Sequence, residues 1–100
     1  MSRKPEHRRL WWNGILVDVR YEPRWLNMGD DVVHLEVVSV CPDYAPLPIT
    51  ETGYRSHFTS SAAIADAGGP VAYVEAWLNA ESRSRAWRER DAAARQPSLF

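Results

Sequence analysis

The pair Asn13-Gly14, set between two runs of apolar and aromatic residues, constrains the fold of this chain more than any other feature. Both residues tolerate the positive φ angles of a two-residue turn, so the pair predicts a β-hairpin. In the range 15–21, every second residue is apolar or aromatic and falls on one face of a strand, while Asp18 and Arg20 fall on the other. The hairpin is therefore expected to be antiparallel and half-buried.

Two further strands are expected downstream of the hairpin. The range 32–40 alternates valine and leucine with His34 and Glu36, which is the pattern of a half-buried strand. Three prolines within 42–48 lack backbone donors, so this range must form a surface loop. A fourth strand is predicted at 49–58.

The rest of the chain favours helices. Thr59 or Ser60 can cap a short helix that stops at Gly68. Pro70 is suited to the first turn of a second helix, in which apolar residues recur at spacings of three and four. Because no glycine or proline interrupts the range 70–95, we expect one long helix whose last turns overhang the body.

These elements predict an α+β fold. Its four-stranded, mostly antiparallel sheet would carry the short helix and the long C-terminal helix on one face. One hundred residues with 45% apolar content make one domain, without room for a second core. We expect a basic N-terminal arm at 1–9, a single domain at 10–95 and a docking peptide at 96–100.

Charge and cysteine content narrow the functional classes. A net charge of −1 gives no overall field that would draw the chain onto nucleic acid. Cys41 is the only cysteine, so no internal disulfide or thiolate zinc site is expected, and we expect it to be a small buried residue. The three histidines show no metal-binding spacing, and no apolar run is long enough to cross a membrane. We therefore expect a cytoplasmic protein without metal or cofactor.

The densest group of functional side chains lies in the predicted fourth strand. Strand alternation would place Glu51, Arg55 and His57 on one face, where they can form an acid/base row or a partner-binding surface. The alternative is an ordinary solvent face with cross-strand ion pairs. Ser56 and His57 point apart in a strand, so they cannot pair as nucleophile and base. The expectation is a non-enzyme, since catalysis would need the three side chains to converge in a concave pocket.

The arginines near the C-terminal end have two interpretations. Opposite charges recur at i,i+4 and predict a solvated helix stabilised by about 0.2–0.5 kcal/mol per pair. These pairs are Glu81–Arg85, Arg85–Glu89 and Asp91–Arg95. Arg83, Arg88 and Arg90 lack such partners and can contact phosphates. The local excess of positive charge is small, so nucleic-acid binding would be weak or absent.

Trp87 also has two interpretations. On an overhanging helix it would be exposed beside arginines, a composition enriched at binding hot spots. Alternatively, it folds back on Trp11, Trp12 or Trp25.

The range 96–100, Gln-Pro-Ser-Leu-Phe, resembles the Gln-x-x-Leu-Phe peptide with which many bacterial replication and repair proteins dock on the DNA sliding clamp. The resemblance implies that Leu99 and Phe100 enter an apolar pocket while the Gln96 amide bonds at its rim. Pro97 departs from the commoner leucine at that position.

Two internal segments, 46–58 and 69–78, resemble small uncharacterised proteins of bacterial phages and plasmids. The resemblance carries no assigned activity. It implies a mobile-element setting, in which clamp binders, regulators and inhibitors of host defence are common.

Three functional hypotheses follow. The first is a non-enzymatic adaptor or inhibitor that binds a protein of the DNA-processing machinery. The expected partner is the sliding clamp, which the C-terminal tail at 96–100 would bind. The second is an anti-CRISPR or antirestriction protein that sterically occludes a nucleoprotein defence complex. The third is a weak nucleic-acid-binding regulator that uses basic residues at both ends of the chain.

Overall fold

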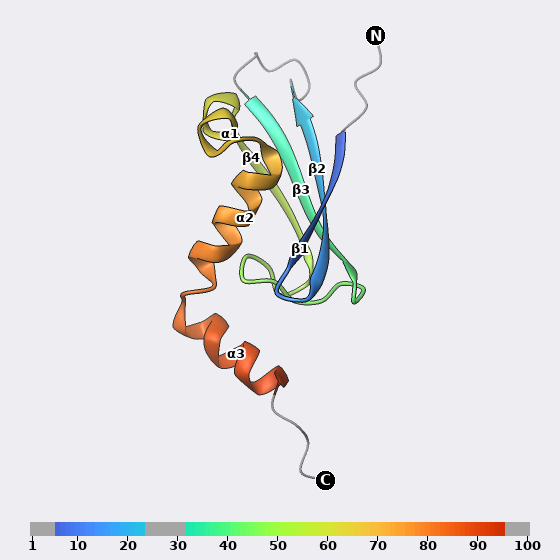
Figure 1. Ribbon diagram of the computed structural model, residues 1–100, viewed down its shortest axis with the longest axis vertical. Coiled ribbons are helices and arrows are strands. Elements are labelled where there is room, and N and C mark those ends of the chain that lie inside the picture. Colours follow the sequence, from blue (N-terminus) through green and yellow to red (C-terminus); the bar gives the residue numbers. More distant parts are fainter. Residues whose placement is uncertain (1–5, 24–31, 96–100) are drawn as a thin grey trace.

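The computed structural model describes residues 6–23 and 32–95 of the chain. Four antiparallel strands form one sheet in the order β1-β2-β3-β4, and the helices lie on one side of it (Figure 1). This arrangement confirms the predicted α+β class. The elements are β1 (Glu6–Trp12), β2 (Ile15–Pro23), β3 (Val32–Cys41), β4 (Tyr54–Ser60), α1 (Ser61–Ala67), α2 (Pro70–Glu81) and α3 (Arg85–Arg95).

The predicted hairpin is confirmed, and its first strand is longer than expected. Asn13 and Gly14 form the turn between β1 and β2, with φ angles of 51° and 79°. β1 begins at Glu6, which pairs with Tyr21, so residues 6–9 belong to the sheet rather than to a basic arm. The charged side chains of this segment hid its strand character, because it lacks the apolar alternation that marks a half-buried strand.

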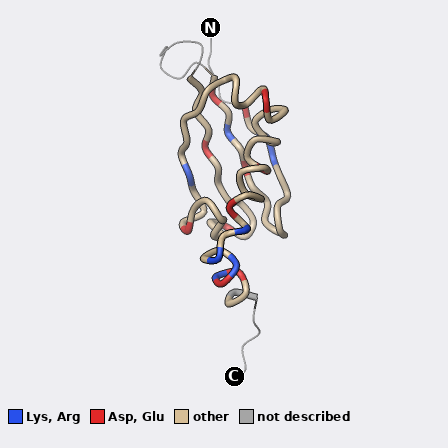
Figure 2. Tube along the Cα trace, turned by 90° about the vertical axis from the view of Figure 1, so that its left-hand side faces the viewer, with Lys and Arg blue, Asp and Glu red and all other residues tan. Residues whose placement is uncertain are grey.

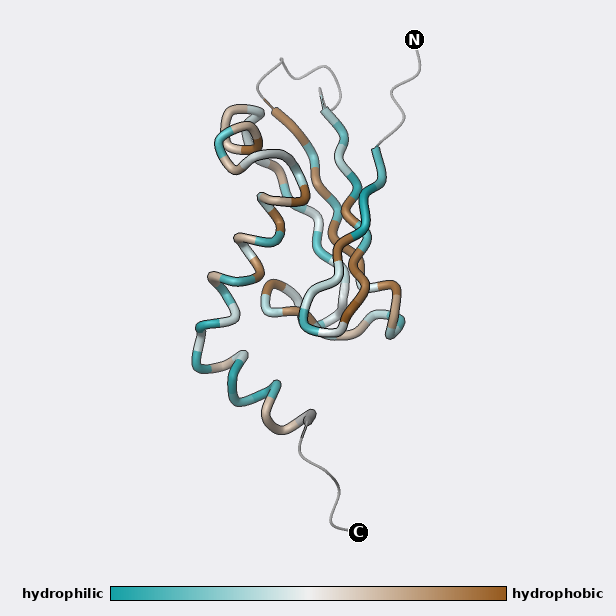
Figure 3. Tube along the Cα trace, in the orientation of Figure 1, coloured by the Kyte–Doolittle hydropathy of each residue, from teal (hydrophilic) through white to brown (hydrophobic). Residues whose placement is uncertain are grey.

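One face of the sheet forms the hydrophobic core with the helices. Val17 and Val19 of β2 and Leu35 of β3 are fully buried there, and α2 contributes Val74 and Leu78. Hydrophobic positions recur along the strands, whereas the first turns of α3 are hydrophilic (Figure 3). Burying each such side chain is worth roughly 1.5–3 kcal/mol, which makes this face the main source of stability.

The predicted signals fix the start and end of α1 and the start of α2. The hydroxyl of Ser60 accepts a hydrogen bond of 3.1 Å from the backbone N–H of Ala63 and caps α1. Gly68 ends α1 with a φ of 101°, and Pro70 occupies the first turn of α2. Within the described ranges, no helix combines the length and the apolar character needed to cross a membrane.

The expectation of one unbroken helix over 70–95 is wrong. α2 ends at Glu81, and α3 starts in a new direction at Arg85 (Figure 1). The Ser82 hydroxyl donates to the Asn79 carbonyl at 2.7 Å, and the Ser84 hydroxyl accepts from the Trp87 N–H at 3.1 Å. Serine side chains compete in this way for the backbone bonds of a helix, and a break was therefore possible without glycine or proline.

The fourth strand starts later than predicted, at Tyr54 instead of residue 49. The preceding residues fold into a tight turn, in which the backbones of Leu47 and Thr50 exchange hydrogen bonds of 2.8 and 3.0 Å. Gly53 follows with a φ of 78°, and a Cβ there would lie 2.6 Å from the backbone of Tyr44. Burial of the apolar side chains at 47 and 49 in the core favours the turn over a continuous strand.

Cys41 is exposed, contrary to the expectation of a buried thiol. It is the last residue of β3, where the chain leaves the sheet for the proline-containing loop.

Candidate binding surface on the open face of the sheet

The second face of the sheet carries charged and aromatic side chains. Within the described residues, the helices lie over the opposite face (Figure 1), and we call this second surface the open face. The strand register aligns its residues into two rows that cross all four strands. The first row is Arg9, Asp18, Val38 and Tyr54; the second is His7, Arg20, Glu36 and Ser56.

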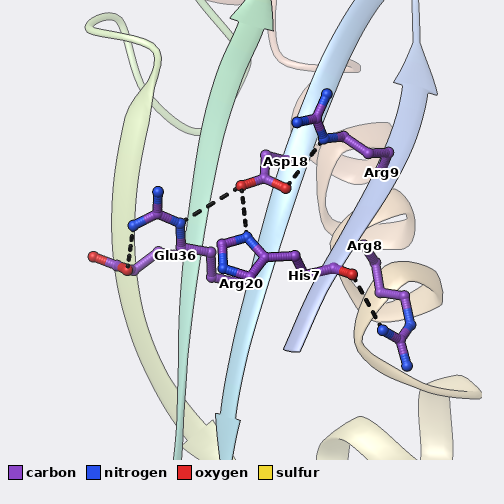
Figure 4. Close-up of polar contacts among 6 residues, drawn as sticks. All are labelled: His7, Arg8, Arg9, Asp18, Arg20 and Glu36. Atoms are coloured by element: carbon purple, nitrogen blue, oxygen red, sulfur yellow. Dashed lines mark hydrogen bonds and ion pairs between the residues drawn. The ribbon is translucent and has the colours of Figure 1, made fainter. Parts of the chain in front are cut away.

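Asp18 lies at the centre of the open face, and three basic side chains converge on it (Figure 4). Its Oδ2 lies 3.3 Å from Nδ1 of His7 and 3.5 Å from Nε of Arg20. Its Oδ1 lies 3.4 Å from Nε of Arg9 and has no hydrogen bond of good geometry. The contact with Arg9 is therefore ionic rather than a fixed hydrogen bond.

The network continues across β3 to β4. Nη1 of Arg20 lies 3.5 Å from Oε1 of Glu36, and the Tyr54 hydroxyl donates to Oε2 of the same carboxylate at 2.5 Å. The hydrogen bond to Glu36, followed by desolvation, raises the pKa of Tyr54 above its ordinary value. Tyr54 therefore stays protonated and holds Glu36 in place. Figure 2 shows that opposite charges are interspersed along the strands, whereas α3 carries a dense run of them.

Acidic and basic groups lie at different depths in this network. The side chain of Asp18 is 7% exposed and that of Glu36 is 25% exposed. Arg9, His7 and Arg20 are 61%, 52% and 45% exposed. An approaching molecule therefore meets basic groups first, with the carboxylates beneath them.

Large aromatic side chains accompany the charges. Trp11 is 67% exposed and lies on the open face because its neighbours in β1 face the core. Phe58 is 51% exposed, and its ring lies 4.6 Å from that of His34, whose Nε2 is 2.7 Å from the Ser56 hydroxyl. Exposed aromatic rings beside arginines are typical of protein-binding surfaces.

The structure keeps two of the three residues that the sequence placed in one polar row on a common face of β4 and separates Glu51 from them. Arg55 and His57 lie on the helix side of β4, where the Arg55 guanidinium is 5.7 Å from the Trp77 ring. The His57 ring is 4.4 Å from the same indole, and its Nε2 is 3.0 Å from the Tyr73 hydroxyl. Burial, and secondarily the charge of Arg55, lowers the pKa of His57.

Glu51 does not join that pair. It lies in the turn before β4 and forms an ion pair of 2.6 Å with Arg90 of α3. The side chains of Glu51, Arg55 and His57 therefore do not converge in a common site.

Trp87 is buried, at 7% exposure, so the expectation of an exposed hot spot is wrong and the folded-back alternative is correct. Its ring lies 5.9 Å from that of Trp12, which also donates from Nε1 to the Asn79 side chain at 2.9 Å. The turn between α2 and α3 makes this packing possible, because it directs α3 back beneath the hairpin.

The predicted contacts of the C-terminal arginines are confirmed only in part. Arg83 and Arg88 are exposed, whereas Arg90 is paired with Glu51 and is not available for phosphate. The predicted pair Arg85–Glu89 forms at 2.9 Å, but the helix break places Glu81 and Arg85 in different helices. Gln96, Leu99 and Phe100 of the predicted docking peptide lie outside the described residues.

The sequence did not reveal the network centred on Asp18. Alternation had placed Asp18 and Arg20 on one face of their strand and His34 and Glu36 on one face of another. Joining the two strands into rows requires the register, which the hydrophobic pattern alone does not specify across a long connection.

Residues 5–87 match the family model described as the KlcB third domain. The chain belongs to this family. The match covers the sheet, α1 and α2 and ends at Trp87, the residue that fastens α3 to the hairpin. No curated protein and no solved structure gives a match. The KlcB domain is plasmid-associated, which agrees with the mobile-element setting expected from the sequence.

Proposed function

We propose that this KlcB-family chain is a non-enzymatic, cytoplasmic binding module of a mobile element, and that it binds a protein partner through the open face. The observation that carries the proposal is the composition of that face. Trp11, Tyr54 and Phe58 are all at least 40% exposed, although the core has ample apolar residues without them. Tryptophan, tyrosine and arginine are the residues that dominate the energy of protein interfaces.

The geometry gives less support to catalysis. Among the described residues, the two ionisable side chains with shifted pKa values are Tyr54 and His57, and they lie on opposite faces of β4. A catalytic site needs such groups to share one cavity, within hydrogen-bond reach of a substrate. A binding role requires only that the open face remain accessible.

Site-specific photo-crosslinking tests the proposal. Trp11 would be replaced by p-benzoylphenylalanine in the cells that naturally encode the chain, and Ala76, exposed on α2, would be replaced as the matched control. We expect a discrete protein adduct from position 11 and none from position 76. An adduct from position 76 alone, or none from either position, would contradict the proposal.

The identity of the partner is a separate part of the proposal. The resemblance of 96–100 to clamp-binding peptides supports a partner in the DNA-processing machinery, with Gln96, Leu99 and Phe100 as the docking residues. Purified sliding clamp would be incubated with the full chain and with a variant that lacks 96–100. Loss of clamp recovery with the shortened variant is the expected result, and equal recovery by both would remove the clamp as partner.

Inhibition of a host defence complex by steric occlusion is the alternative protein-binding role, and the plasmid association of the family favours it. The measurement is plasmid or phage entry into restriction-proficient and CRISPR-active hosts, with and without the chain. Unchanged restriction in both hosts would end this alternative.

A further inference from the structure

We propose that Arg9 and Arg20 receive the side-chain carboxylates of an acidic segment on the partner protein. Asp18 and Glu36 act beneath them as positioning residues. This inference rests on the proposed function and specifies the chemistry of the partner. It assigns to the open face both a binding site and the group that the site recognises.

The first argument is the direction of the guanidinium groups. Arg9 and Arg20 approach Asp18 from two sides, and each does so through its Nε. Among the described residues, Arg9 contacts a carboxylate only through its Nε. Arg20 contacts Asp18 through its Nε and Glu36 through its Nη1. Terminal N–H groups of both arginines are therefore left for a second carboxylate, and guanidinium groups bind carboxylates through paired donors.

The second argument is the fixed position of the central carboxylate. Asp18 is 93% buried as a side chain, since 7% of it is exposed, and its Oδ1 has no hydrogen bond. A buried charge of this kind is tolerated only when cations remain close to it. Asp18 consequently holds both arginines over the centre of the sheet and reduces the side-chain entropy that they would lose on binding.

The third argument separates an acidic protein from a nucleic acid. In this network two arginines balance two carboxylates, so the net charge contributed by these four groups is zero. Binding to a phosphate backbone depends on an excess of cations and on the release of counterions. A balanced network attracts little at a distance and acts at contact, where hydrogen-bond geometry decides specificity.

The aromatic side chains fit the same partner. Trp11 lies two residues from Arg9 on the same face of β1, and Tyr54 shares the cross-strand row of Arg9 and Asp18. Apolar surface next to the arginines excludes water from the ion pairs, which strengthens them. The favoured segment therefore alternates acidic and aromatic residues.

Fluorescence anisotropy with two labelled peptides tests the inference. One peptide is a twelve-residue repeat of Glu-Tyr, and the other is the same repeat with Gln in place of Glu. We expect the full chain to bind the Glu-Tyr peptide about tenfold more tightly, in line with a charge-assisted pair. Arg9→Gln and Arg20→Gln should each remove most of this preference. Arg85→Gln, which removes the same charge from α3, should retain it.

Asp18→Asn provides the sharpest distinction. It raises the net charge of the chain by one unit, so a simple charge effect would tighten binding to the acidic peptide. Loss of the positioning carboxylate should instead weaken binding about threefold, with an unchanged far-ultraviolet circular dichroism spectrum as the check on folding. Tighter binding by Asp18→Asn would overturn the positioning role.

Two other results would overturn the inference as a whole. One is equal affinity for the Glu and Gln peptides. The other is tighter, arginine-dependent binding to a twelve-nucleotide oligothymidylate, which would make the open face a nucleic-acid surface. A photo-crosslinked adduct that persists in Arg9→Gln and Arg20→Gln would retain the proposed function while rejecting carboxylate recognition.

Discussion

The two faces of the sheet are built from the same strands and differ in the burial and the charge of their side chains. On the covered face, Val19 and Leu35 have no exposed surface and belong to the hydrophobic core to which the helices also contribute. On the open face, their immediate neighbours Asp18, Arg20 and Glu36 form an ion network above the backbone. The difference teaches that burial and surface charge are divided between alternate residues of one strand, so neighbouring substitutions should have unlike effects.

The largest expected effect tests this division within β3. Leu35→Ala should lower the free energy of unfolding by about 3–5 kcal/mol, because the site is fully buried among core side chains. Glu36→Ala, one residue away on the open face, should cost about 1 kcal/mol. Urea denaturation of both variants gives the measurement. Similar losses would show that the two faces are not energetically distinct.

The next effect compares two tryptophans of different exposure. Trp87→Ala should cost about 3 kcal/mol and release α3, because its ring packs on Trp12 at the end of the core. Trp11→Ala should stay within about 0.5 kcal/mol of the original chain, since that side chain is 67% exposed. Urea denaturation with circular dichroism at 222 nm measures both changes. A stable, fully helical Trp87→Ala variant would contradict the role of this residue as the anchor of α3.

A smaller effect is expected at the centre of the open face. Asp18→Asn should lower stability by about 1–2 kcal/mol, since the basic partners of the buried carboxylate are half-exposed and can be rehydrated. The measurement is again the midpoint of urea unfolding. A gain in stability would mean that the network is a cost of function alone, held in place by the core.

The smallest effect concerns pH and the covered side of β4. The pKa of His57 is lowered by burial, so below its ordinary value of 6.5 the unfolded chain binds more protons at this residue than the folded one. Its contribution to stability is therefore complete above pH 6.5 and is lost as the pH falls through the lowered pKa. The stability difference between pH 7.5 and pH 5.5 should shrink in His57→Gln, because the other titrating groups are common to both chains. An unchanged difference would contradict this assignment.

Local signals were sufficient to predict much of the fold. Asn13-Gly14, Ser60, Gly68 and Pro70 each act on the backbone within a few residues, and the structure places a turn, a cap, a stop and a helix start at these positions. The break after Glu81 was missed because the local serine hydrogen bonds only permit it, and a tertiary contact favours it. Burial of the Trp87 ring against Trp12 outweighs the helix propensity of the intervening residues.

The candidate site could be predicted only in part, for a related reason. Alternation correctly assigned the polar residues of β2 and β3 to one side of each strand, but ion pairs between strands depend on register. Glu51 lies apart from Arg55 and His57 because the prediction assumed a strand where the burial of Leu47 and Ile49 favours a turn. Local sequence patterns cannot predict ion pairs between residues far apart in the sequence, such as the pair of Glu51 and Arg90.

The change of direction between α2 and α3 has a consequence for how many molecules the chain can hold at once. α3 has eleven residues and is therefore about 16 Å long, and it leads away from the strands beneath the hairpin (Figure 1). A body seated on the sheet and another attached beyond Arg95 would be kept apart by this spacer. The chain could then act as a tether, in which one attachment raises the local concentration for the other.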